Sequence, residues 1–285
     1  MYHLQGVEMV RGGRTILSVD SLNIPINELT VVLGHNGSGK STLVSLLSGQ
    51  QAPDKGFVEL NGQSLSSLAA KELAKSVAFL PQKLPTSAGL TVRELVRLGR
   101  FPWRGALGRW KTEDETIIDE SIAKTGVTDF THTLADELSG GERQRAWVAM
   151  LLAQQSPVLI LDEPTSALDV HHQYQLMALL AELNQTQGCG IIVILHDLNL
   201  ALRYATHIVA LKQGRIAFEG AAELLLDEQR LSELYHSPIR LIEHPQPAAE
   251  SKTIRSPSYV LKNPKKGISK PSCTLQFITL WSGSG

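Results

Sequence analysis

Short apolar runs alternate with helical patterns along most of the chain. Four of these runs have the length and composition of buried strands, at residues 77–80, 158–161, 191–195 and 207–211. Because strands that alternate with helices are typical of parallel sheets, we predict an α/β fold with a mainly parallel core sheet.

The beginning of the chain has a different pattern. Residues 4–10, 18–24 and 57–60 mix apolar and polar positions, with turn signals at Gly12-Gly13 and Asn61-Gly62. Turns of this composition join antiparallel strands, since both residues can adopt positive φ. We therefore predict an N-terminal antiparallel β subdomain.

The middle of the chain has a helical pattern. Thr91 and Glu94 have the spacing of a capping box, and so do Thr112 and Glu115, which predicts a helix start at each place. Gly126 is predicted to end the second of these helices.

These patterns predict one large domain over residues 1–244, with a helical lobe at about 90–155 inserted into the α/β core. The composition is ordinary for a globular protein, with 42% apolar and 19% charged residues in a chain of 285. Residues 245–285 are rich in basic, Pro and Ser positions, which favours a disordered tail.

Charge and cysteine usage exclude several classes of function. The formal net charge is −1 and no basic stripe is visible, so nucleic-acid binding is not indicated. Two cysteines without metal-type spacing predict a reducing compartment and no disulfide framework. No secretory signal opens the chain and no apolar run approaches the roughly 20 residues of a membrane span. We expect the protein to reach a membrane only through a partner.

Residues 34–42 form a complete phosphate-binding loop with a strand pattern before it and a helical pattern after it. The glycines let successive N–H groups point inward, and the helix start adds its positive dipole end. Lys40 is predicted to reach the β- and γ-phosphates, and the Ser41 hydroxyl to hold Mg²⁺. The predicted nucleotide ligands are Gly34, His35, Asn36, Gly37, Ser38, Gly39, Lys40, Ser41 and Thr42.

Two carboxylates follow the apolar run at 158–161, where ligands bind at the ends of parallel strands. Asp162 is predicted to hold Mg²⁺, directly or through water. Glu163 is predicted to take a proton from an attacking water, as a general base.

The segment 138–144 reads Leu-Ser-Gly-Gly-Glu-Arg-Gln. Ser139 and Glu142 form a capping box, so a helix is predicted to begin here. Ser139 and the N–H groups of Gly140 and Gly141 are predicted to form a second anion site. Because one chain then has two phosphate-binding ends, we expect a head-to-tail homodimer, with each ATP between the loop of one subunit and Ser139 of the other.

The motifs together resemble the nucleotide-binding subunits of ABC transporters, over about residues 4–244. The resemblance implies that Gln82 senses Mg²⁺ or the attacking water, that Asp169 organises the dimer seam, and that His196 contacts the γ-phosphate. The family also places an aromatic residue about 25 positions before the phosphate loop, to stack on adenine. Alignment puts Met9 at that position, and Met9 is therefore expected to pack on the base.

The segment 99–110 resembles iron-siderophore importer ATPases, and most closely the ferric-hydroxamate branch. This implies a peripheral ATPase on the cytoplasmic side of the bacterial inner membrane, acting with permease subunits and indirectly with a periplasmic or surface siderophore-binding protein. Trp103 and Trp110 are interpreted either as simple packing or as part of a groove for a permease helix. Two alternatives stay open for the whole chain: a haem or vitamin B12 importer, and a soluble ABC ATPase without a transport role.

Overall fold

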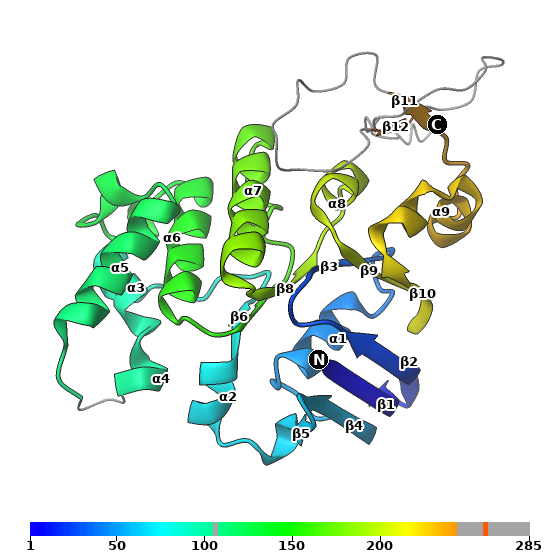
Figure 1. Cartoon of the computed structure of the whole chain (residues 1–285), viewed down its shortest axis with the longest axis horizontal. Coiled ribbons are helices and arrows are strands. Elements are labelled where there is room, and N and C mark those ends of the chain that lie inside the picture. The colour runs from blue at the N-terminus through cyan, green and yellow to red at the C-terminus, as the bar shows by residue number, and fades with distance from the viewer. Residues whose placement is uncertain (105–107, 244–258, 262–285) are drawn as a thin grey trace.

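A computed structural model describes residues 1–104, 108–243 and 259–261 (Figure 1). The N-terminal strands form a four-stranded sheet in the order β2-β1-β4-β5, in which every pairing is antiparallel. The Gly12-Gly13 and Asn61-Gly62 turns both have positive φ, as predicted. The strands are β1 (Tyr2–Arg11), β2 (Arg14–Ile24), β4 (Lys55–Leu60) and β5 (Gln63–Ser64).

The core sheet has six strands in the order β10-β9-β3-β8-β7-β6. Its pairings are parallel except for the edge strand β10, which runs antiparallel to β9. This confirms the predicted α/β class and the mainly parallel core. The strands are β3 (Leu29–Leu33), β6 (Val77–Leu80), β7 (Val158–Leu161), β8 (Gly190–Ile194), β9 (His207–Lys212) and β10 (Arg215–Ala221).

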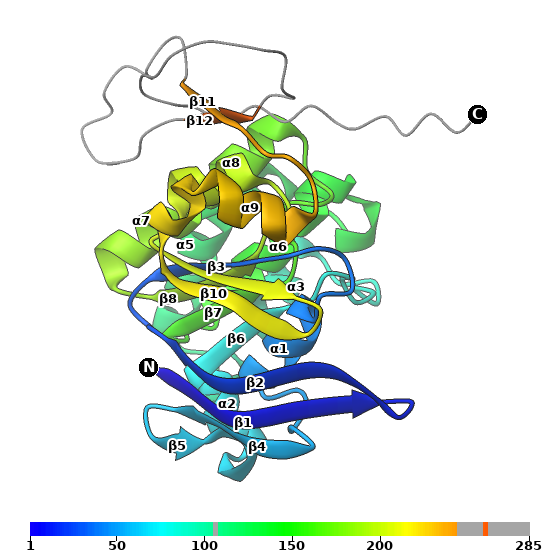
Figure 2. The same ribbon diagram turned by 90° about the vertical axis from the view of Figure 1, so that its right-hand side faces the viewer.

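The helices divide into two groups (Figures 1 and 2). One group, α3 to α6, lies together at one side of the molecule, and the others surround the sheets. The helices are α1 (Lys40–Leu47), α2 (Ala70–Ser76), α3 (Val92–Leu98), α4 (Phe101–Arg104), α5 (Thr112–Lys124), α6 (Gly140–Ala153), α7 (Val170–Gln187), α8 (Leu198–Tyr204) and α9 (Glu228–Tyr235). Shorter elements are η1 (Leu65–Ser67), η2 (Thr128–Phe130), η3 (Ala135–Glu137), η4 (Ala222–Leu226), β11 (Leu241–Glu243) and β12 (Tyr259–Leu261).

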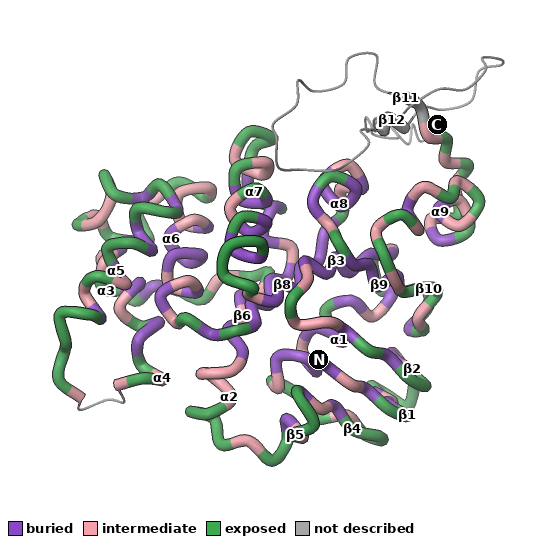
Figure 3. Tube along the Cα trace, viewed as in Figure 1, coloured by how far each residue is buried: buried purple, intermediate pink, exposed green. Residues whose placement is uncertain are grey.

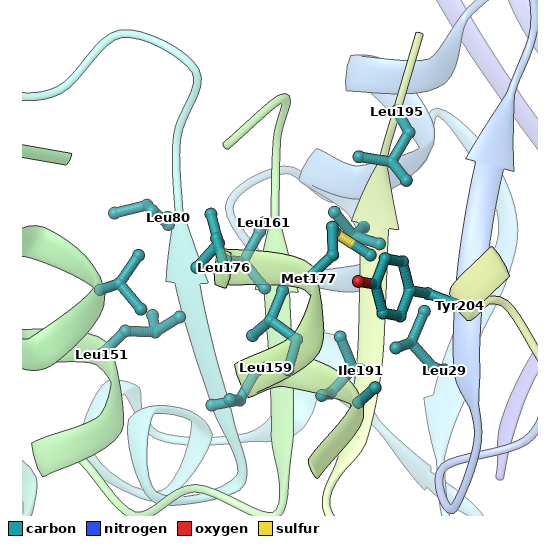
Figure 4. Packing of buried hydrophobic residues seen from close by; sticks show 14 of the residues in the cluster. Leu29, Leu80, Leu151, Leu159, Leu161, Leu176, Met177, Ile191, Leu195 and Tyr204 are labelled. Carbon is teal, nitrogen blue, oxygen red and sulfur yellow. The ribbon is translucent and has the colours of Figure 1, made fainter. Parts of the chain in front are cut away.

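The five parallel strands of the core sheet are buried on both faces (Figure 3), as expected for a parallel sheet, whereas the edge strand β10 alternates between exposed and half-buried residues. Along β3, Val31 and Leu33 belong to a cluster with the helices of one face, while Val32 belongs to a second cluster. Figure 4 shows part of the first cluster, where Leu176 and Met177 of α7 pack near Leu161 of β7. The second cluster joins α1 to both sheets, so α1 is packed between them.

The predicted helix start at Thr112 and Glu115 is off by one position. Lys111 is the N-cap residue, and its N–H donates to Asp114 Oδ2 at 3.2 Å. The Glu115 carboxylate instead accepts hydrogen bonds from Arg93 and Arg97 of α3. Two tertiary ion pairs therefore outweigh the local capping pattern. The box at Thr91 and Glu94 and the end near Gly126 are confirmed.

The disordered tail predicted for residues 245–285 lies outside the described residues, apart from 259–261, which form β12. Among the described residues, none of the helices combines the length and apolar character that a membrane crossing needs.

Candidate functional site

The phosphate-binding loop connects β3 to α1, as its sequence predicts. Gly39 is the N-cap residue of α1 and has a φ of 100°, a left-handed conformation that favours glycine. Gly34, at the start of the loop, has a φ of 144°, and a Cβ there would lie 2.3 Å from the Leu211 carbonyl oxygen of β9. The loop therefore begins in close backbone contact with the core sheet, which fixes its position.

Lys40 is the first residue of α1, and its side chain turns back into the loop. Its Nζ donates to the carbonyl oxygens of Gly34 at 2.9 Å and His35 at 3.0 Å. Burial lowers the pKa of Lys40, while the charges of Glu163 and Asp162 act in the opposite direction. The ammonium group is thus held where the loop N–H groups would meet a phosphate.

Asp162 follows β7 directly and is only 7% exposed. Its Oδ1 lies 3.5 Å from the Ser41 hydroxyl of α1. Burial raises the pKa of Asp162, and the hydrogen bond from Ser41 opposes the rise. Two of the three predicted metal contacts, Ser41 and Asp162, therefore lie side by side, at the junction of the loop and a strand end.

Glu163 has hydrogen-bonding partners on both carboxylate oxygens. Gln82 Nε2 donates to Oε2 at 2.5 Å, and His196 Nε2 lies 2.5 Å from Oε1. The three side chains come from the segments after β6, β7 and β8, which end at the same edge of the sheet. Glu163 also has a φ of 49°, and such strained conformations often occur at active sites. The structure thus brings the predicted catalytic residues together around Glu163.

Ser139 is the N-cap residue of α6, on the helical side of the molecule. Its hydroxyl accepts from the Glu142 N–H at 3.4 Å, and the Glu142 carboxylate accepts from the Ser139 N–H at 2.9 Å, which confirms the predicted capping box. Ser139 and Gly140 are exposed, with Gly141 half-buried. These hydrogen bonds are local to α6 and do not join Ser139 to the cluster around Lys40.

Asp169 is the N-cap residue of α7 and accepts from the His172 N–H at 2.9 Å. It is exposed, and the segment before it lies beside the start of α6, where a Cβ on Gly141 would be 3.4 Å from Leu168. Ser139 and Asp169 therefore belong to one continuous part of the surface.

The structure contradicts the adenine-stacking role predicted for Met9. The Met9 side chain is 0% exposed and packs in the cluster between the two sheets, opposite Leu17 of β2. Alternate residues of a strand face opposite sides, and Met9 falls on the inner side of β1. In the β1–β2 hairpin, the residue that lies against the phosphate loop is Ile16. Its carbonyl oxygen would be 3.2 Å from a Cβ on Gly39.

Sequence reasoning did not find the Asp136 side chain, which connects the segment after Gln82 to α6. Its carboxylate accepts from the N–H groups of Ser87 at 3.2 Å and Gly89 at 3.4 Å, and it pairs with Arg143 at 3.5 Å. Arg143 also donates to the Pro85 carbonyl oxygen at 3.1 Å. No local sequence motif indicates this arrangement, because its residues are far apart along the chain.

Sequence reasoning also missed the packing of His35 against the end of α9. Its ring lies 5.2 Å from that of Tyr235 and 5.6 Å from that of His236, measured between centroids.

Comparisons with known proteins agree with this geometry. Residues 17–166 match the family model described as ABC transporter. The chain is 40% identical over 234 residues to the ferric enterobactin transport ATP-binding protein FepC of Escherichia coli, covering 82% of this chain and 86% of that protein. It is 38% identical over 235 residues to the iron(3+)-hydroxamate import ATP-binding protein FhuC of Bacillus subtilis, covering 82% and 87%.

Among solved structures, the fold is similar to a dimeric ATP-binding cassette in a post-hydrolysis state bound to ADP and Pi. The TM-score is 0.70 at 30% identity, covering 78% of this chain and 99% of the other. The phosphate loop, the carboxylates after β7 and the Ser139 segment occur here within the fold that such cassettes share. The chain therefore belongs to the ABC transporter family, as an ATP-binding subunit whose ATP hydrolysis is coupled to transport.

Proposed function

We propose that this chain binds Mg-ATP at the loop 34–42 and hydrolyses it with Glu163 as the general base. The observation that carries the proposal is the convergence of Gln82 and His196 on the two oxygens of the Glu163 carboxylate, beside Lys40. Gln82 and His196 hold the carboxylate in place, and Lys40 balances charge on the β- and γ-phosphates. Such positioning and charge neutralisation account for most of the catalysis of phosphoryl transfer.

The oxygen atoms of Ser41 and Asp162, 3.5 Å apart, fit a small hard cation that prefers oxygen ligands. Gln82 is the third proposed contact, directly or through water. A bound Mg²⁺ would neutralise phosphate charge at this position. The rest of the nucleotide-binding set consists of the loop residues, with Met9 removed because its side chain is buried.

Ser139, Gly140, Gly141 and Asp169 are proposed to complete the site of a second subunit. Support comes from the exposure of Ser139, Gly140 and Asp169, from the place of Ser139, Gly140 and Gly141 at the N-terminal end of α6, and from the dimeric cassette that the fold resembles. Val170, beside Asp169, is an apolar residue that is 68% exposed, which suits a surface that a second copy covers.

Dimer formation can be tested with Glu163→Gln. This variant should bind ATP and elute as a dimer in size-exclusion chromatography with saturating ATP and Mg²⁺, and as a monomer with AMP. Asn36→Cys and Ser139→Cys, placed together in a background without other cysteines, should crosslink between subunits only with ATP. A strictly monomeric variant with no such crosslink would remove the proposed dimer.

The proposed cargo is a ferric siderophore, with hydroxamates favoured as in the sequence prediction. The similarity to the enterobactin and hydroxamate ATP-binding proteins supports the siderophore class, and their identities of 40% and 38% do not separate the two chemistries. The chain would work on the cytoplasmic face of the inner membrane with permease subunits, supplied by a siderophore-binding protein outside.

The proposed permease contact includes the exposed aromatic residues of the helical side. Trp103 and Trp110 are 43% and 40% exposed, and the Arg104 guanidinium lies 3.6 Å from the Trp110 ring centroid. Trp103 is tied to α6 through a hydrogen bond from Nε1 to the Gln154 carbonyl oxygen. Residues 105–107 of this segment lie outside the described residues.

The cargo can be tested by growth on single iron sources after loss of the gene. Failure on ferric hydroxamates alone would establish the favoured cargo, and failure on ferric catecholates alone would keep the siderophore class but replace the chemistry. Failure on haem alone would exclude siderophore import. Complementation with the Glu163→Gln variant serves as the control for a need for hydrolysis.

A further inference from the structure

The phosphate loop is held from outside by the end of α9. The His35 ring stacks on the His236 ring at an interplanar angle of 18° and meets the Tyr235 ring edge-on at 63°. Tyr235 lies 200 positions after His35 in the sequence. The end of a helix that is distant in sequence therefore packs against the predicted phosphate-binding loop.

The contact reaches the atoms that hold the catalytic lysine. Lys40 Nζ is hydrogen bonded to the carbonyl oxygens of Gly34 and His35. The two acceptors belong to the planar peptide units on either side of the His35 Cα, so a displacement of the His35 backbone would move both. The rings of Tyr235 and His236 oppose such a displacement.

The end of α9 is itself firmly attached to the core. Leu231 and Leu234 are buried, and Lys212 of β9 donates to the Glu233 carbonyl oxygen at 2.6 Å. His236 is the left-handed C-cap residue of the helix, and its N–H donates to the Ser232 carbonyl oxygen. The two rings are thus presented to the loop from a fixed position.

The contact includes two buried polar atoms, one on the His35 ring and one on Tyr235. His35 Nε2 and Tyr235 Oη have no partner in hydrogen-bonding geometry among the described residues. Burial raises the pKa of Tyr235, and the nearby Gly34 backbone opposes part of the rise. The Tyr235 hydroxyl thus lies near the Gly34 backbone, at the start of the loop.

We infer that Tyr235 and His236 are positioning residues that act through His35. They hold the phosphate loop, with the two carbonyl oxygens that accept from Lys40, in the conformation that binds a nucleoside diphosphate. The inference rests on the proposed function, since it concerns the same loop. An aromatic contact of this kind corresponds to about a two- to tenfold change in affinity.

The test measures the Kd for Mg-ADP of the full-length protein by calorimetry. Tyr235→Ala and His236→Ala should each raise the Kd about two- to tenfold. Tyr235→Phe keeps the ring that packs on His35, so it should bind ADP like the original protein. Gln229→Ala, an exposed position on the same helix, is the matched control and should leave the Kd unchanged.

His35→Ala provides a second route that leaves α9 intact. It should raise the Kd for ADP by a similar factor, and combining it with Tyr235→Ala should add little, because both changes remove one contact. Fully additive effects, or unchanged ADP binding in Tyr235→Ala and His236→Ala, would overturn the inference. Failure of the unsubstituted protein to bind ADP would instead overturn the proposed function.

Discussion

The Nε atom of Arg100 lies 2.9 Å from Oδ1 of Asp114, and both side chains are only 7% exposed. Arg100 also donates to the Ala153 carbonyl oxygen at 2.9 Å. The pair therefore ties the segment after α3 to the start of α5 and the end of α6. It is a buried polar link within the helical part of the molecule.

Removing one partner of this pair should destabilise the protein. Asp114→Asn leaves the Arg100 charge buried without its counter-ion, which typically costs about 3–5 kcal/mol. Urea unfolding followed by circular dichroism should show a lower midpoint with a similar slope. Glu113→Gln, at the neighbouring exposed position, should change the midpoint little, and an equal loss in both variants would contradict a special role for the pair.

The same pair predicts how stability depends on acid. Burial acts to raise the pKa of Asp114, but the hydrogen bonds from Arg100 and Lys111 and the charge of Arg104 outweigh it, so the pKa lies below 3.8. When the pKa of a carboxyl group is lower in the folded state, the group stabilises the protein at a pH above its pKa in the unfolded state. That stabilisation is lost as the pH falls through the pKa of the folded state. Below pH 3.8 the unfolding free energy should therefore fall more steeply than in Asp114→Asn.

Met9→Tyr should lower stability and should not tighten ATP binding. The Met9 side chain is fully buried, so a larger, polar side chain would overpack the cluster between the two sheets. Such changes cost about 1–3 kcal/mol. Thermal unfolding and ATP titration measure the two effects separately. A folded variant of unchanged stability and higher ATP affinity would restore Met9 as the adenine platform.

Glu163→Gln should reduce ATP turnover at least about a hundredfold while the Kd for ATP stays within a few-fold. The amide keeps the shape of the carboxylate but accepts protons poorly, so the loss falls on the chemical step. Steady-state phosphate release gives the turnover, and calorimetry gives the Kd. Near-normal turnover would remove Glu163 from the role of base.

Asp136→Asn should slow ATP turnover without weakening ATP binding. The carboxylate holds the N–H groups of Ser87 and Gly89, in the segment that follows Gln82. Weaker, uncharged hydrogen bonds would let Gln82 leave Glu163, and we expect kcat to fall about tenfold. Asp129→Asn, at an exposed position of η2, is the control. A higher Kd with unchanged kcat would contradict the proposed link.

Local patterns were enough to predict the five parallel core strands, the phosphate loop and the carboxylates after β7, but not the edge strand β10. Each depends on neighbours within a few residues: a continuous apolar run, a glycine-rich loop, or a strand followed by acids. Met9 was placed wrongly because a distance along the chain does not say which face of a strand a residue takes. One register position separates a core residue from an exposed one.

Local patterns did not predict several contacts between distant segments. Glu115 fits a local capping pattern, yet Arg93 and Arg97 of another helix attract its carboxylate. The pairing of His35 with Tyr235 depends on where α9 ends in space, which no local pattern encodes. The roles of Gln82 and His196 were expected from the family resemblance alone, and their convergence on Glu163 depends on the strand order of the sheet.

Because α1 is packed between the two sheets, it has little freedom to shift by itself when the loop at its N-terminal end closes on a phosphate. Any small displacement must be passed to the strands that cover it, including β1 and β2. We therefore expect amide hydrogen exchange in this hairpin to change when a nucleotide binds, which would report occupancy without a label in the pocket.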